Sequence, residues 1–82
     1  MNKIKVYLFA TLRDYTGKKT IDMEIPNSIT IAGLKSLLIK AYPKLAPVQD
    51  SMMAAINREY ASDEQTLPND AEIAFFPPVS GG

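Results

Sequence analysis

The chain has 82 residues, 46% of them hydrophobic, and its nine basic side chains balance nine acidic ones. This composition is typical of one small globular domain. Because the chain contains no cysteine and no histidine, disulfides, zinc sites built from these ligands, thiol nucleophiles and histidine-dependent triads are excluded. Zero net charge argues against nucleic-acid binding, and the apolar runs are too short for a membrane span. We therefore expect a cytoplasmic protein that binds neither membranes nor nucleic acid.

Two strands are predicted in the first third of the chain. In residues 3–9, the side chains at positions 4, 6 and 8 are apolar and share one face, while positions 5, 7 and 9 share the other. A second alternating segment, Thr20–Ile25, ends at Pro26. Residues 14–19 are polar and include Gly17, which is typical of a hairpin connection. We therefore expect the two strands to be joined by a turn.

One helix is predicted between Thr30 and the residue that precedes Pro43. The Thr30 hydroxyl is a suitable N-cap, and a proline disfavours helical geometry in the residue before it. The expected buried stripe comprises Ile31, Leu34, Leu38 and Ala41, with Leu37 beside it. Lys35 and Lys40 are expected on the solvated face. Gly33 costs some helix propensity in the first turn, and its missing side chain allows a close approach of another group to its backbone.

The second half of the chain is predicted to hold two or three further strands. They lie at residues 53–57, at Glu59–Ala61 and at residues 71–76, separated by polar turns and by a loop over residues 63–70. Residues 43–51 form a connection with room for a short helical turn. A helix between strand pairs, packed on one face of a mixed sheet, is a two-layer α+β arrangement. We expect the last strand to pair with the first.

The segment after the last strand is the most informative motif. Its order is Phe76, Pro77, Pro78, Val79, Ser80, Gly81 and Gly82. The prolines discourage collapse of the tail onto the domain, and a Gly-Gly end is slender enough to thread a narrow channel. Six residues from position 77 reach roughly 20 Å when extended. Although a frayed terminus is the simpler alternative, the motif favours an extended, flexible tail (77–82) that presents the α-carboxylate of Gly82 beyond a folded domain (1–76).

Three segments together resemble the MoaD family, the small sulfur-carrying subunits of molybdopterin synthase. They read YLFATLRD at residues 7–14, AINR at 55–58 and AEIAFFPPVSGG at 71–82. The resemblance covers essentially the whole chain and implies a ubiquitin-like β-grasp fold, with a sheet of four to five strands packed on one main helix. ThiS-type carriers for thiamine synthesis share the fold and the Gly-Gly end. Archaeal ubiquitin-like modifiers also share both, so these two classes stay open as alternatives.

The resemblance implies a role for Gly82 in molybdenum cofactor biosynthesis. An E1-like adenylyltransferase would use ATP and magnesium to form an acyl-adenylate, and a sulfurtransferase or cysteine desulfurase would supply the sulfur of a Gly82 thiocarboxylate. The large subunit of the synthase would receive the tail, and sulfur would pass to a pterin precursor, cyclic pyranopterin monophosphate. This implies a heterotetramer with a central dimer of large subunits. The chain itself would bind no cofactor and no metal and would supply no acid–base group.

Three residues are candidates for contact with the partner. Phe75 shares the parity of Ile73 and is expected in the core, whereas Phe76 has the opposite parity and is expected to face outward as an anchor. Tyr60 and Arg13 match positions that line the partner surface in the MoaD family. For both residues an ordinary surface position is an equal alternative.

Overall fold

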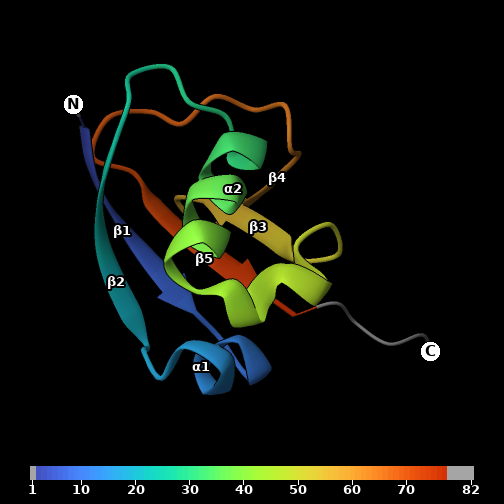
Figure 1. Ribbon diagram of the computed structural model, residues 1–82. Helices are drawn as coiled ribbons and strands as arrows, with labels where there is room; N and C mark the ends of the chain where they lie inside the picture. The colour runs from blue at the N-terminus through green and yellow to red at the C-terminus, as the bar shows by residue number, and fades with distance from the viewer. Residues whose placement is uncertain (1, 78–82) are drawn as a thin grey trace.

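The computed structural model describes residues 2–77, so Met1 and residues 78–82 lie outside the described part of the chain. Within this range one mixed sheet contains β1 (Asn2–Leu8), β2 (Thr20–Ile25), β3 (Met53–Ile56), β4 (Glu59–Ala61) and β5 (Glu72–Phe76) (Figure 1). The order across the sheet is β2-β1-β5-β3-β4, with β1 and β5 parallel and the other neighbours antiparallel. The predicted pairing of the last strand with the first is confirmed. It makes β5 the central strand.

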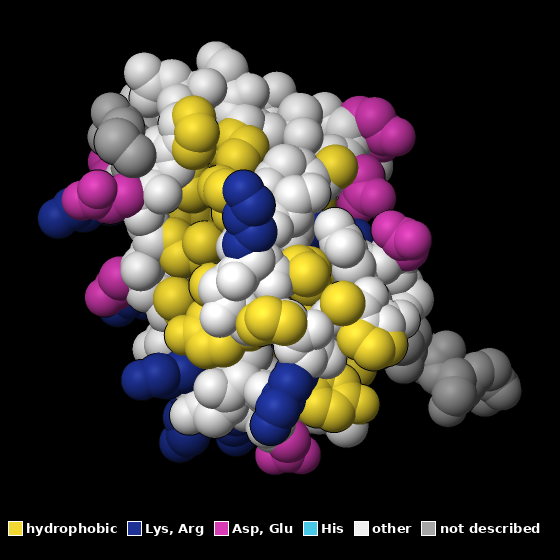
Figure 2. Space-filling model, in the orientation of Figure 1, with side chains coloured by type: hydrophobic (Ala, Val, Ile, Leu, Met, Phe, Trp, Pro, Cys, Tyr) yellow, Lys and Arg dark blue, Asp and Glu magenta, His cyan; other side chains and the backbone are white. Residues whose placement is uncertain are grey.

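The helices occupy one face and one end of the sheet. Helix α2 (Ile31–Ala41) crosses one face, helix α1 (Thr11–Thr16) follows β1, and the 3-10 helix η1 (Pro43–Val48) follows α2 (Figure 1). The two-layer α+β arrangement is thus confirmed. The short helical turn considered for residues 43–51 is also present, as η1. On the helix side, apolar side chains also reach the surface as a stripe between β2 and α2 (Figure 2).

The core lies between α2 and the inner face of the sheet, the face that α2 covers. The predicted alternation is confirmed, because Val6, Ile73 and Phe75 are fully buried there. Leu34 and Leu38 of α2 are fully buried against them. Complete burial of one such side chain stabilises the fold by about 1.5–3 kcal/mol. This inner layer is therefore the main source of stability.

The start of α2 is fixed by its cap and by a neighbouring loop. Thr30 is the predicted N-cap, and its Oγ1 accepts a hydrogen bond of 3.2 Å from the Gly33 N–H. The N–H groups of Ile31 and Ala32 donate to carbonyl oxygens of the loop that joins β4 to β5. A Cβ at Gly33 would lie 2.6 Å from Cγ1 of Ile29, which confirms the predicted close approach at this glycine.

Helix α1 corrects the prediction of a turn over residues 14–19. It spans only six residues, and Ala10 at its N-cap makes no side-chain hydrogen bond, so neither a periodic pattern nor a capping residue marks it in the sequence. Its Leu12 is nevertheless fully buried. Gly17 ends the helix with φ +72°, a left-handed conformation that favours glycine, and its N–H donates to the Arg13 carbonyl.

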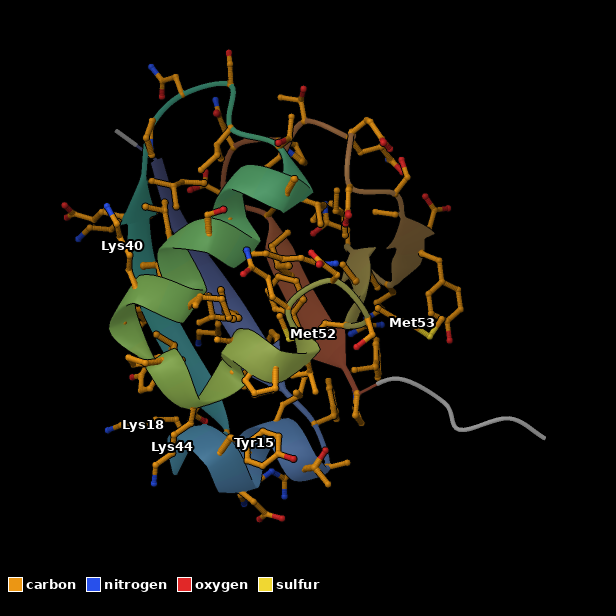
Figure 3. All side chains as sticks on the ribbon, turned by 45° about the vertical axis from the view of Figure 1, so that its right-hand side comes forward. Tyr15, Lys18, Lys40, Lys44, Met52 and Met53 are labelled. Atoms are coloured by element: carbon orange, nitrogen blue, oxygen red, sulfur yellow. The ribbon has the colours of Figure 1, made fainter. Side chains whose placement is uncertain are left out.

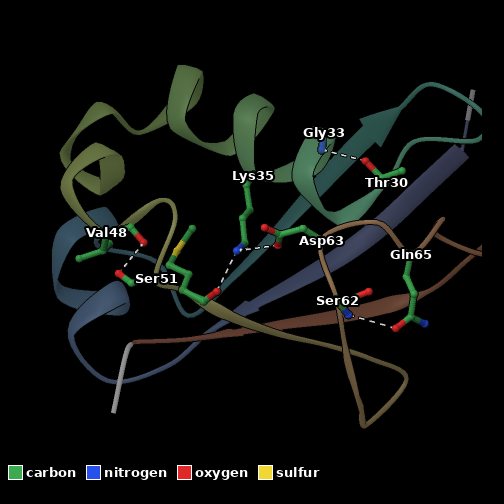
Figure 4. Close-up of polar contacts among 9 residues, drawn as sticks. Thr30, Gly33, Lys35, Val48, Ser51, Ser62, Asp63 and Gln65 are labelled. Carbon is green, nitrogen blue, oxygen red and sulfur yellow. Dashed lines mark hydrogen bonds and ion pairs between the residues drawn. The ribbon is translucent and has the colours of Figure 1, made fainter. Parts of the chain in front are cut away.

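Lys35 corrects the prediction of a solvated position. It is 4% exposed, and its Nζ donates to the Met52 carbonyl at 2.8 Å and pairs with Asp63 Oδ1 at 2.9 Å (Figure 4). At 3.6 residues per turn, position 35 lies only about 40° around the helix from Ile31 and so falls within the buried stripe. Ala41, predicted as part of that stripe, is exposed instead because it is the last residue of α2 and lies on the edge of the stripe.

Candidate functional site

The outer face of the sheet, which points away from α2, carries uncovered apolar side chains at the end where β5 stops. We call them the aromatic patch: Phe9, Met53, Tyr60 and Phe76. Phe9 and Met53 are each 38% exposed, Tyr60 is 74% exposed, and Phe76 is half-buried. Because the register pairs Met53 with Phe76 and Tyr60 with Ala55, the side chains of Met53, Tyr60 and Phe76 share one face, and Phe9 joins them by stacking on Phe76.

Two aromatic contacts hold the patch together. The rings of Phe9 and Phe76 are stacked with centroids 4.9 Å apart and planes 9° from parallel. Tyr60 is tilted by 57° against Phe76 at a centroid distance of 6.2 Å. Such pairs contribute about 0.5–1.5 kcal/mol each beyond the area that they bury. The stack therefore presents Phe76 in one orientation beside the point where β5 ends.

A shallow hollow of about 460 Å³ opens next to the patch. Its lining comprises Tyr7, Phe9, Ala55, Arg58, Tyr60, Glu72, Ala74 and Phe76. Ala55 and Ala74 are paired across β3 and β5. Their short side chains leave a depression between the larger neighbours. The hollow is therefore large enough to admit a bulky side chain.

The far end of the hollow is polar. The Tyr7 hydroxyl donates to Glu72 Oε2 at 2.8 Å, and this hydrogen bond is the main reason that the pKa of Tyr7 is raised above its ordinary value. Partial burial and the negative charge of Glu72 act in the same direction. The Glu72 N–H donates to Asn57 Oδ1 at 2.9 Å, and the Asn57 N–H donates to the Glu72 carbonyl at 2.8 Å.

Arg58 reaches the hollow from the turn that joins β3 to β4. Asn57 and Arg58 form a two-residue connection with φ +49° and +73°. Positive φ at both central positions is the type I′ geometry, whose twist matches that of the flanking strands. The sequence therefore places a guanidinium at one end of the hollow and the aromatic patch at the other.

The predicted contact residues are only partly brought together. Phe76 and Tyr60 both belong to the patch, and Phe75 is fully buried as predicted. Arg13 lies exposed on α1 and does not line the hollow. Pro77 is half-buried directly after β5. The remaining tail positions, Pro78, Val79, Ser80, Gly81 and Gly82, lie outside the described residues.

Sequence reasoning missed Phe9 and Met53 as members of the patch. The alternation did place Phe9 on the outward face, but its stacking partner depends on the pairing of β1 with β5. Met53 shares a face with Phe76 only because of the register between β3 and β5. Strand register is set by tertiary structure, so it is not readable from either segment alone.

Over residues 2–77, no group of three or more acidic side chains is placed to hold a metal ion. Within the same residues, no helix is long and apolar enough to cross a membrane.

A mixed sheet packed on one main helix, with the last strand parallel to the first at its centre, defines a ubiquitin-like β-grasp domain. A solved structure of this class, SAMP1 from Haloferax volcanii, superposes with a TM-score of 0.85 and 28% sequence identity. The match covers 99% of this chain and 100% of that one. SAMP1 denotes a small archaeal modifier protein.

The chain belongs to the ThiS family, which matches residues 6–82. A relative from Arabidopsis thaliana is 34% identical over 80 residues, covering 98% of this chain and 83% of the relative. A relative from Caenorhabditis briggsae is 33% identical over 84 residues and is covered completely, as is this chain. Both relatives are named molybdopterin synthase sulfur carrier subunit. The resemblance to the MoaD and ThiS carriers is therefore confirmed at the level of the family.

Proposed function

We propose that this chain is the sulfur-carrier subunit of a molybdopterin synthase and that the α-carboxylate of Gly82 carries the sulfur. The observation that carries the proposal is the likeness over the whole chain to carriers of this name. The position of the aromatic patch supports it, because Phe76 and Met53 lie where the central strand ends and the tail begins. A partner that covers the patch receives the tail at the same place.

The proposed chemistry takes place at the terminal carbon rather than at a side chain. An E1-like adenylyltransferase uses ATP and magnesium to convert the carboxylate of Gly82 to an acyl-adenylate, releasing pyrophosphate. The persulfide of a sulfur donor, either a sulfurtransferase or a cysteine desulfurase, then displaces AMP and forms an acyl disulfide. A second thiol cleaves its S–S bond, which releases the Gly82 thiocarboxylate and leaves the donor sulfur in a disulfide with that thiol. This sulfur passes to the pterin precursor, cyclic pyranopterin monophosphate, and the carboxylate is regenerated. The chain's own part is to dock and to present one atom.

We propose the large subunit of molybdopterin synthase as the partner that covers the patch. An uncovered apolar patch beside a hollow is typical of a protein–protein contact. Phe76 and Tyr60 are the proposed anchors, and the hollow over Ala55 and Ala74 accepts one bulky apolar side chain. The proposed complex is a heterotetramer of two large and two small subunits, whose mass is measured by mass photometry of the mixed proteins.

Deletion of Gly82 tests the proposed chemistry directly. The full chain and the shortened chain are both prepared with a chemically installed terminal thiocarboxylate, which removes any dependence on the activating enzyme. With the large subunit and precursor, the full chain forms dithiolene product, and the shortened chain forms none because its sulfur stops about 3.5 Å short. Melting temperatures serve as the control for folding. Normal product from the shortened chain contradicts the proposal.

A protein modifier is the second candidate function, because the SAMP1 structure matches essentially the whole chain at 28% identity. In that case the activated Gly82 forms isopeptide bonds with lysines of other proteins. Mass spectrometry of the chain recovered from cells distinguishes the two functions. A terminal thiocarboxylate supports the carrier. Residues 59–82, the tryptic fragment that follows Arg58, joined through Gly82 to lysines of other proteins support the modifier. A ThiS-type carrier for thiamine synthesis is distinguished by a thiazole product in place of the dithiolene.

A further inference from the structure

Two consecutive methionines at the start of β3 have opposite environments. Met52 is 3% exposed and belongs to the core, whereas Met53 is 38% exposed and belongs to the aromatic patch (Figure 3). Neighbouring side chains in extended backbone point to opposite faces, so one methionine of the pair lies on each side of the sheet. The same side-chain chemistry is therefore present once in a protected position and once on the surface.

The buried ammonium group of Lys35 holds the backbone at Met52, directly before β3. Lys35 Nζ donates to the Met52 carbonyl at 2.8 Å, and Lys35 is itself 4% exposed. This contact ties the beginning of β3 to α2. Met53 then pairs with Phe76 in the register of β3 and β5, which places the two side chains next to each other on the outer face.

A thioether is the most readily oxidised group that this chain can present. The sequence contains no cysteine and no tryptophan among its 82 residues. Of the described methionines, Met23 is half-buried against the core and Met52 is buried. An exposed thioether is converted to a sulfoxide by peroxides, and methionine sulfoxide reductases reverse the change. Among the described methionines, Met53 is therefore the one whose thioether is most accessible to peroxide.

We propose that Met53 is a reversible oxidation site that controls docking through the aromatic patch; this inference rests on the proposed function. In the reaction, the sulfur of Met53 takes one oxygen atom from hydrogen peroxide. The O–O bond breaks, the S–O bond forms and water leaves, so sulfur is oxidised by two electrons and peroxide is reduced by two. The product places a polar S–O group beside Phe76, in a surface that a partner must dehydrate.

The consequence follows from the cost of burying an unpaired polar group. A sulfoxide beside Phe76 puts a polar oxygen into the apolar patch that the partner covers, so we expect the affinity for the large subunit to fall about tenfold. The fold is unaffected, because Met53 does not belong to the core. The device would stop sulfur delivery under oxidative conditions and restore it after reduction.

The first arm of the test measures selectivity. The folded chain is treated with hydrogen peroxide for increasing times and digested with trypsin, which releases one peptide, residues 45–58, that contains both methionines. Tandem mass spectrometry assigns the added oxygen to Met52 or Met53. We expect Met53 to be oxidised at least about ten times faster than Met52. Equal rates in the folded protein overturn the proposal.

The second arm measures docking to the large subunit of molybdopterin synthase by calorimetric titration. Peroxide weakens binding of the wild type and of Met52→Leu, whereas Met53→Leu binds equally well before and after treatment. Met53→Gln, a polar substitute, binds weakly without peroxide. Melting temperatures show that the variants are folded.

The outcomes separate this inference from the proposed function. Selective oxidation of Met53 with unchanged affinity overturns control of docking and leaves the proposed function standing. If the reduced wild type does not bind the large subunit, the proposed partner and the docking consequence are both wrong. The ratio of Met53 to Met52 oxidation still decides whether Met53 is the modification site.

Discussion

The two faces of the sheet differ in how their apolar side chains are covered. On the inner face, α2 buries Ile73 and Phe75 completely. On the outer face, Phe9 remains 38% exposed and Tyr60 74% exposed, although both belong to an ordered aromatic cluster. An apolar group that no other part of residues 2–77 covers contributes little to the fold, and its position is best explained by a partner. The inner face is thus expected to determine stability, and the outer face to determine binding.

The largest effect is expected on the inner face. Phe75→Ala removes a fully buried ring and leaves a cavity, so the free energy of unfolding should fall by about 3–5 kcal/mol. Chemical denaturation measures the change. A loss below about 1 kcal/mol would show that the inner face is not the main source of stability.

The next effect is expected on the outer face and in binding rather than folding. Phe76→Ala removes the ring that touches both Phe9 and Tyr60, and it should weaken binding of the large subunit by roughly 1–4 kcal/mol. Its effect on stability should be smaller than that of Phe75→Ala, its neighbour in the same strand. If the two variants lose equal stability and Phe76→Ala binds normally, the assignment of the faces is wrong.

Lys35 is a charged side chain on the helix side of the sheet, where the other buried side chains are apolar, so its contribution to stability can be tested separately. Lys35→Met keeps the apolar stem but leaves the Met52 carbonyl without its Nζ donor, which should cost about 1–3 kcal/mol of stability. Asp63→Ala is the matched control. Asp63 is 49% exposed, so loss of the ion pair itself should cost less than about 1 kcal/mol. Equal losses would show that the ion pair matters more than the carbonyl contact.

The smallest effect concerns the Tyr7–Glu72 hydrogen bond on the outer face. Because the pKa of Tyr7 is raised in the folded state, its contribution to stability is fully present below the unfolded value of about 10. It is lost as the pH rises through the higher folded value. The wild type should therefore lose stability more steeply than Tyr7→Phe above about pH 10. Parallel curves from denaturation at several pH values would contradict this.

Much of the fold was predictable because local patterns and tertiary structure agree. The alternation at Ile4, Val6 and Leu8 gave the correct buried face of β1, and Thr30 gave the correct helix start. The opposite positions of Phe75 and Phe76 followed from strand periodicity alone. Such features depend on residues that are close in sequence, where periodicity and capping chemistry act.

The features that escaped prediction depend on residues that are far apart in sequence. The burial of Lys35 requires the carbonyl of Met52 and the carboxylate of Asp63, which the fold brings together. The stack of Phe9 on Phe76 requires the pairing of β1 with β5. The hollow likewise requires that two alanines meet across β3 and β5. The site was therefore less predictable than the fold, apart from the motif at the chain end.

The central position of β5 has a mechanical consequence. The strand is bonded to β1 on one side and to β3 on the other, and it leads directly into Pro77. A force applied along the chain beyond Pro77 acts parallel to β5, so the hydrogen bonds on both sides are loaded in shear and must break together rather than one by one. The domain is thus built to resist traction at this end. A pull on the chain beyond Pro77 would therefore meet two rows of strand hydrogen bonds at once, instead of unravelling the sheet from an edge.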